Sequence, residues 1–221
     1  MEKSLNEETY EKLKHDIMTF HLEPGDVISA QKIATRFSVS RTPAREAIVK
    51  LEKEDLVRIL PQSGTYVARI NTARAEQEWF VRMSLEVAMV DRFFENVNEE
   101  TIERMEEYNN RLIHYDDNKE SCSRLEIDNA FHQLIYETTG ETLAADIIKT
   151  QMSHYNRIRY LAELNQSISS KTNDEHRSLI EAARNKDKAA YLDIIQRHIY
   201  RIFGEEDNLR NIYPDYFGAS I

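Results

Sequence analysis

The chain has 221 residues, among them five glycines, four prolines and a single cysteine, and its formal net charge is −10. At about 150 residues per domain, this length predicts one large domain or two small ones. No two glycines fit the phosphate-binding patterns G-x-G-x-x-G or G-x-x-x-x-G-K-[ST], which argues against nucleotide-driven chemistry.

Cysteine content and hydropathy indicate the cellular compartment of the protein. Cys122 has no second cysteine for an internal disulfide, and the N-terminal residues contain no apolar stretch of the signal-peptide type. No apolar run exceeds four residues, which is far short of a membrane span. We therefore expect a soluble, cytoplasmic protein.

Charge is distributed unevenly along the chain. Residues 1–70 hold 11 basic and 11 acidic side chains, so the whole excess of acids lies in residues 71–221. Residues 31–69 are locally positive, with eight basic and four acidic side chains. Such a stretch can hold phosphates while an acidic body discourages non-specific binding, although a solvated charged face would have the same composition.

The N-terminal third has the pattern of a helix-turn-helix. Apolar spacing predicts helices at about 5–20, 30–37 and 42–54, with EPGD ending the first and SVSR joining the last two. In the third helix the positions i, i+3, i+4 and i+7 should face inward: Ala44, Ala47, Ile48 and Leu51. The positions left pointing outward are Arg41, Thr42, Arg45 and Glu46.

Two β-rich runs follow these helices. Residues 56–60 and 65–69 are separated by Pro-Gln-Ser-Gly, which predicts a hairpin whose turn is supplied by Gly64. Three helices and a hairpin make a winged helix.

The run LEPGDVISAQKIATRFSVSRTPAREAIVKLEKEDLVRILPQSGTYV resembles the winged-helix domain of the GntR family of bacterial transcription regulators, over roughly residues 8–70. The resemblance rests on PG after the first helix, SRTPxREAI on the recognition helix, LV before the wing and GTYV after it. Ser38 and Asp55 stand where the family often has glycine.

This resemblance implies double-stranded DNA as a partner. We expect Arg41 and Arg45 to reach guanine edges or phosphates in the major groove, and Ser40 and Thr42 to anchor phosphates. Gly64 would let the wing approach the minor groove. Because helix-turn-helix proteins act as two-fold dimers, a homodimer on a palindromic operator is expected.

From Thr72 onward the pattern is helical, without strand-like alternation. It predicts six helices, at about 72–96, 99–116, 123–139, 142–165, 172–185 and 187–203. A tail, 205–221, should pack locally or fray. The expected fold class is mainly α, with an N-terminal winged helix-turn-helix domain over 1–70 and a C-terminal all-α helical bundle over 71–221.

Four polar side chains of this second region should point into the bundle. Asp128 and His132 lie four apart on one helix, so they project from one face about 6 Å apart. His176 and His198 each fall on the apolar face of a helix. A lone inward histidine is usually satisfied by a neighbour's hydrogen bond, but three together with an inward aspartate favour a bound cation.

The pattern D-x-x-x-H, then EH at one helix start and H late in the last helix, resembles the FCD domain, the FadR C-terminal domain of a GntR subfamily. The helix count is similar to its six-helix, VanR-like branch. The resemblance implies that four residues ligate a divalent metal: Asp128, His132, His176 and His198. Three nitrogens and one oxygen suit zinc, nickel, manganese or iron, with further positions open to water or a carboxylate effector.

The resemblance favours a small organic acid as effector. Arg82, in the pattern R-x-x-x-E with Glu86, matches a position that often faces the cavity in such domains, and its planar fork could clamp a carboxylate. A surface ion pair between Arg82 and Glu86 at i, i+4 explains the same spacing. Arg157 is a weaker candidate for the effector site.

These features predict a DNA-binding transcriptional regulator, with repression as the family default and no membrane partner. Two alternatives stay open: a dimer whose helical domain is purely structural, and a metal-dependent enzyme. The sequence shows neither paired acid/base carboxylates beside the metal residues nor a Ser/His/Asp group in motif context, which argues against the enzyme.

Overall fold

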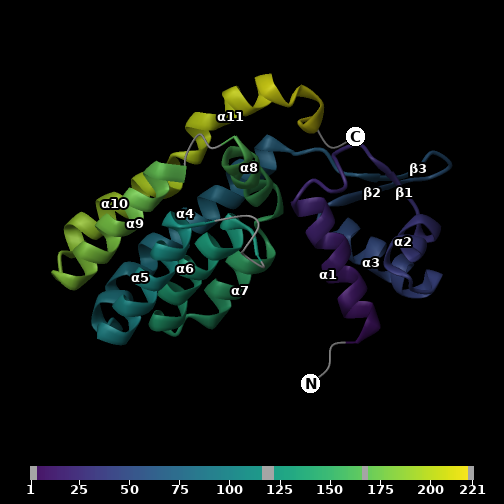
Figure 1. Cartoon of the computed structure of the whole chain (residues 1–221). Helices are drawn as coiled ribbons and strands as arrows, with labels where there is room; N and C mark the ends of the chain where they lie inside the picture. The colour runs from purple at the N-terminus through teal and green to yellow at the C-terminus, as the bar shows by residue number, and fades with distance from the viewer. Residues whose placement is uncertain (1–3, 116–121, 166–168, 219–221) are drawn as a thin grey trace. The chain divides into compact units, whose positions relative to one another are not determined.

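The computed structural model describes residues 4–115, 122–165 and 169–218 (Figure 1). Its contacts divide the chain into two compact units. The first unit consists of Met1–Glu76, Ser153–Tyr160 and Asn208–Ile221, and the second of Gln77–Met152 and Leu161–Asp207. Among the described residues, no helix combines the length and the apolar character needed to cross a membrane.

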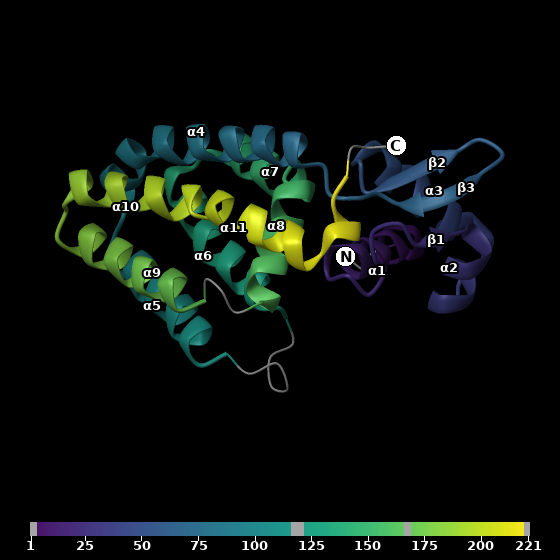
Figure 2. The ribbon, with the colours of Figure 1, turned by 90° about the horizontal axis from the view of Figure 1, so that it is seen from above.

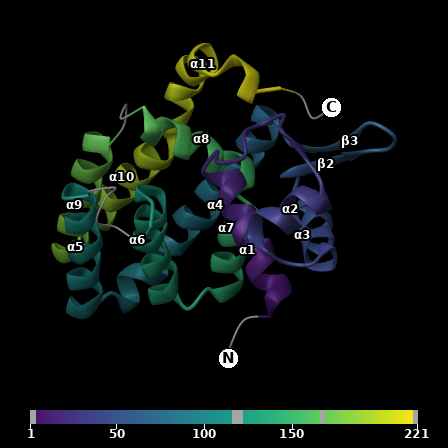
Figure 3. The same cartoon turned by 45° about the vertical axis from the view of Figure 1, so that its right-hand side comes forward.

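The first unit contains the predicted winged helix. Its elements are α1 (Leu5–Met18), β1 (Val27–Ile28), α2 (Ala30–Phe37), α3 (Arg41–Lys53), β2 (Val57–Leu60) and β3 (Gly64–Val67). Helix α3 packs against both α1 and α2. The strands form an antiparallel sheet in the order β1-β3-β2, and Figure 3 shows the β2-β3 hairpin projecting beside α2 and α3.

The predicted inward face of α3 is buried. Ala44 and Leu51 have no exposed surface, and they join the core that α1 contributes through Leu13 and Ile17. Strand β1 was not predicted, because two residues are too short to show an alternating pattern. It adds two pairs to β3, with Val27 opposite Tyr66.

The two departures from the family's glycines occupy left-handed backbone positions. Ser38 caps the end of α2 at φ 56°, and Asp55 follows α3 at φ 58°. Glycine adopts this region without a Cβ penalty, whereas other residues pay about 1 kcal/mol. The sequence keeps the same helix ends at a modest cost in stability.

The residues from Asn208 onward complete the first unit. The tail was predicted to pack locally or fray; up to the last described residue, 218, it is packed, with Leu209 buried, and it forms α11 (Ile202–Ile212) and a 3-10 turn, η1 (Pro214–Tyr216). The backbone N–H of Ile70 donates to the Tyr216 carbonyl at 2.8 Å, and Phe217 beside it is buried. This pairing ties the end of the chain to the residues that follow the wing.

Histidine 154, on the first half of α8 (Ser153–Leu164), is buried in the same unit. Its Nδ1 accepts a hydrogen bond from the Asn71 backbone N–H at 3.2 Å. Burial, helped by the positive charges of Arg157, Arg74 and Arg58, lowers the pKa of His154 to about 3.

This lowered pKa predicts a loss of stability in mild acid. Because the unfolded chain binds a proton near pH 6.5 and the folded one only near pH 3, the unfolding free energy falls as the pH drops through 6.5. Between pH 7.5 and 5.5, His154 alone should cost about 1.4 kcal/mol. In His154→Asn the amide oxygen keeps the bond to Asn71, so urea unfolding should show a smaller pH dependence. Identical pH dependence in the two proteins would contradict this.

The second unit is helical. It is built from α4 (Thr72–Asn96) beyond Glu76, α5 (Glu99–Ile113), α6 (Arg124–Thr139), α7 (Thr142–Thr150), the end of α8, α9 (Ser169–Arg184), α10 (Lys188–Tyr200) and the start of α11. Helix α5 packs against both α6 and α9, and α9 packs against α10 (Figure 2).

The predicted count of six helices is wrong, because the described residues from Thr72 onward form eight α-helices. One of the extra helices is α11. The other arises because the helix predicted at 142–165 is two, α7 and α8, separated at Gln151 and Met152. Neither glycine nor proline marks this break, and the buried Ile148 and Met152 keep the helical spacing across it. The predicted end of α5 at residue 116 lies outside the described residues.

Helix α6, which carries two of the predicted metal residues, begins and ends at the predicted signals. The Ser123 side chain accepts from the Glu126 backbone N–H, and the Glu126 carboxylate accepts from the Ser123 N–H, which is a complete capping box. Gly140 ends the helix at φ 73°. These caps fix the length of the helix on both sides of Asp128 and His132.

Candidate metal centre

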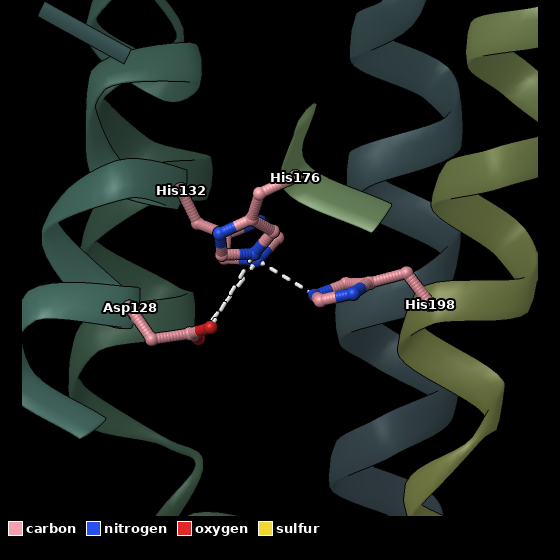
Figure 4. A group of neighbouring side chains, drawn as sticks. All are labelled: Asp128, His132, His176 and His198. Atoms are coloured by element: carbon pink, nitrogen blue, oxygen red, sulfur yellow. Dashed lines mark hydrogen bonds and ion pairs between the residues drawn. The ribbon is translucent and has the colours of Figure 1, made fainter. Parts of the chain in front are cut away.

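The four predicted metal residues meet inside the second unit (Figure 4). Asp128 and His132 lie one turn apart on α6, His176 comes from the middle of α9, and His198 from the last turns of α10. One ligand atom from each lies within 4.8 Å of the others. Their exposed fractions are 9% for His198 and 3% or less for the other three.

The same ring nitrogen of each histidine takes part in these contacts. His132 Nε2 lies 3.1 Å from His198 Nε2 and 3.9 Å from an Asp128 oxygen. His176 Nε2 lies 3.4 Å from the other Asp128 oxygen. Neither nitrogen of the fully buried His176 has a hydrogen-bond partner among the described residues.

The opposite nitrogens of two of these rings face carboxylates. His132 Nδ1 lies 3.2 Å from Glu86 Oε2, and His198 Nδ1 lies 2.8 Å from Glu175 Oε2. A carboxylate oxygen accepts hydrogen bonds, so each Nδ1 is the donor. In a neutral imidazole the remaining nitrogen, Nε2, then carries a lone pair.

Electrostatics support this assignment. Although burial opposes its ionisation, the Arg82 charge and the bonds from His132 and Tyr136 hold the pKa of Glu86 well below its usual range. Burial lowers the pKa of His176 and the pKa of His198 well below the ordinary value for histidine. The neighbouring histidines add to the lowering, and the charge of Asp128 opposes it in both cases. Both rings are therefore neutral at pH 7.

In the neutral tautomers that donate from Nδ1, the two Nε2 lone pairs lie 3.1 Å apart next to a carboxylate, and they repel one another unless a cation or a proton lies between them. Three imidazole nitrogens and one carboxylate oxygen match the donors that zinc, nickel, manganese and iron accept. Carboxylates on the far nitrogens are also typical of metal-bound histidines. The residues fit a divalent cation.

Arg82 and Glu86 form the predicted pair but not at the surface. Arg82 Nε lies 2.6 Å from Glu86 Oε1, and the two residues are 2% and 4% exposed. The interpretation as a surface pair is therefore wrong, because helix α4 turns this face toward the histidines rather than toward solvent. A role of Arg82 in effector binding stays a prediction.

Arg157 lies in the first unit. It is fully buried on α8, and its guanidinium carbon is 5.6 Å from the centre of the Phe20 ring. Its predicted role in effector binding also stays a prediction.

Three residues near the centre were not predicted as part of it. Glu175 entered the sequence-based prediction only as part of the EH pattern, and Glu86 only as the partner of Arg82. Tyr191 on α10 is buried, and its hydroxyl has no hydrogen-bond partner among the described residues. Burial and the charge of Glu86 raise the pKa of Tyr191 well above its ordinary value. The i, i+7 spacing of Tyr191 and His198 on one helix was the available signal.

The residues predicted to contact DNA lie on the exposed face of α3 and at the wing. Arg41, Thr42 and Arg45 are exposed and line a shallow surface hollow together with Glu46, Val49, Lys50 and Lys53. Ser40 is the N-cap residue of α3. Gly64, at φ 129°, begins β3 at the hairpin turn.

Two family models match the chain. The model of the bacterial regulatory proteins of the gntR family matches residues 5–67, and the FCD domain model matches residues 79–201. Together they cover the winged helix and the helices that carry the four predicted metal residues.

Individual proteins agree with these models. The HTH-type transcriptional repressor RspR of Escherichia coli is 28% identical, over 96% of this chain and 93% of its own. The gluconate operon transcriptional repressor of Bacillus licheniformis is 25% identical over 90% of this chain and 83% of its own. The structure of Escherichia coli McbR/YncC superposes with a TM-score of 0.76 at 18% identity, covering 96% of this chain and all of that one.

Proposed function

Because the chain belongs to the gntR family of bacterial regulatory proteins and carries an FCD domain, it is a helix-turn-helix transcriptional regulator, and we propose that it is a repressor controlled by a small organic acid. The matched families and relatives are regulators and not enzymes. Repression is supported by the two relatives named as repressors. The acid would bind at or near a divalent cation in the helical domain.

The DNA contacts follow from the exposed face of α3. Arg41 and Arg45 would reach base edges or phosphates in the major groove, while Ser40 and Thr42 hold the backbone. The hairpin carrying Gly64 would lie along the minor groove. A homodimer places two such faces on one duplex, so the operator should be a palindrome.

The observation that carries the effector proposal is the meeting of three histidine nitrogens and the Asp128 carboxylate in a buried centre. These four side chains would hold the cation, which would supply Lewis acidity toward an oxygen ligand. The buried Tyr191 hydroxyl, whose pKa the charge of Glu86 helps to raise, could donate a hydrogen bond to an organic acid, and Arg82 beside Glu86 would place a positive charge near the acid. An acid that binds one DNA-binding state better than another shifts operator affinity by that difference.

Operator titrations test this proposal. Binding of a selected palindrome is measured by fluorescence anisotropy with acetate, malate, citrate and gluconate, each with and without a chelator. At least one acid should change operator affinity fivefold or more, within the range usual for allosteric coupling, and the chelator should remove the change. Unchanged affinity under every condition would leave the helical domain with a purely structural role.

A further inference from the structure

Building on the proposed metal site, we propose that Glu86 is a positioning residue that fixes the tautomer of His132, so that its Nε2 lone pair faces the cation. The structure assigns the same task, fixing the tautomer, to Glu175 at His198. Glu175 contacts His198 and Arg201 through one oxygen, so we expect a glutamine there to disturb the histidine less. His132 and His198 are the two ligands whose far nitrogens lie on carboxylates.

The two oxygens of Glu86 have different partners. Oε1 accepts from Arg82 Nε at 2.6 Å and from the Tyr136 hydroxyl at 2.5 Å. Oε2 faces His132 Nδ1 at 3.2 Å. All four side chains are buried, so water does not compete for these positions. The carboxylate is held on one side by two donors and can offer only an acceptor to the imidazole.

Glu175 uses a single oxygen for both of its partners. Its Oε2 lies 2.8 Å from His198 Nδ1 and 2.7 Å from Arg201 Nη1. The Glu175 side chain is 23% exposed, against 2% for Glu86. Its second oxygen is not needed to hold the histidine.

His176 is held by a different contact. Its ring lies parallel to that of Phe131, with centres 3.9 Å apart and planes inclined by 3°. Its Nδ1 has no hydrogen-bond partner among the described residues. The orientation of His176 therefore depends on packing and on Nε2, whereas His132 and His198 depend on their carboxylates.

Replacing each glutamate with glutamine should have different effects on the two histidines. In Glu86→Gln, Arg82 can only donate, so the amide oxygen must take the Oε1 position. The amide NH2 then faces His132 Nδ1 and makes it an acceptor. The proton moves to Nε2, where it blocks the lone pair. In Glu175→Gln the amide oxygen can serve His198 and Arg201 together, so the His198 tautomer should persist.

Metal affinity and NMR test this inference in the full chain. Zinc affinity, measured by competition with a chromophoric chelator, should fall 10- to 100-fold in Glu86→Gln, the usual range for carboxylates behind metal-bound histidines. Glu175→Gln, in which the amide oxygen can still accept from His198 Nδ1, should lose less zinc affinity than Glu86→Gln. Long-range ¹H–¹⁵N spectra of the metal-free proteins should show His132 protonated on Nδ1 in the wild type and on Nε2 in Glu86→Gln.

Two results would overturn the inference. One is equal zinc affinity in Glu86→Gln and wild type. The other is a wild-type His132 protonated on Nε2 without metal, a measurement that stands even if the variant does not fold. If the wild type binds no zinc, the proposed metal function fails, while the tautomer in the metal-free protein still decides the role of Glu86.

Discussion

Replacing His176 with phenylalanine should abolish the stabilisation of the protein by divalent metal. The wild type in zinc at a hundred times its dissociation constant should gain about 2.7 kcal/mol in unfolding free energy. The variant loses one of three nitrogen donors from a fully buried centre, so its metal affinity should fall at least about a hundredfold, and the gain should nearly disappear.

Phenylalanine is chosen because it preserves the packing of this side chain. The His176 ring stacks on Phe131, and an aromatic replacement keeps that contact without leaving a cavity. Metal-free stability should therefore be near that of the wild type. His114→Ala, at an exposed position at the end of α5, is the control and should keep the full metal-dependent gain. A normal zinc response in His176→Phe, measured by urea unfolding, would contradict the assignment.

Arg45→Ala should weaken operator binding by about 1–3 kcal/mol, which is roughly 5- to 150-fold. Arg45 is exposed on the face of α3 that lies opposite the buried Ala44, Ala47 and Ile48, so its removal leaves the core intact. A bidentate contact to a guanine edge contributes to sequence discrimination, whereas a phosphate contact does not.

The comparison of two DNAs distinguishes these contacts. Affinities for the selected operator and for random duplex are measured by anisotropy at fixed salt, because ionic strength alone changes both. A base-reading Arg45 predicts a larger loss on the operator. Equal losses on both duplexes would mean that Arg45 contacts phosphate only. Lys12→Ala, exposed on α1 outside the recognition helix, should leave both affinities nearly unchanged.

The winged helix could be predicted closely because its signals are local. Apolar spacing, the caps of α2 and the Gly64 turn all lie within a few residues of the elements they define. The α7–α8 break was missed for the opposite reason, because the buried face continues through Met152 and no local stop signal interrupts it. The helical form of the tail was likewise not foreseen.

The clustering of these side chains could be predicted because each histidine falls on an apolar helix face, where an imidazole needs a partner. The carboxylates that face two of these histidines, Glu86 and Glu175, could not be predicted from the sequence. Glu86 and His132 are 46 residues apart, and only the packing of α4 beside α6 shows that the Glu86 side chain reaches His132 rather than solvent. The burial of Arg82 follows from the same packing.

The most direct test of the account is the metal content of the purified full chain. After equilibrium dialysis against micromolar zinc and removal of free ion, elemental analysis should find about one zinc per wild-type chain. It should find almost none in the double variant Asp128→Ala/His132→Ala, which lacks both α6 ligands. Equal zinc content in the two proteins, or none in the wild type, would contradict a cation held by these four side chains.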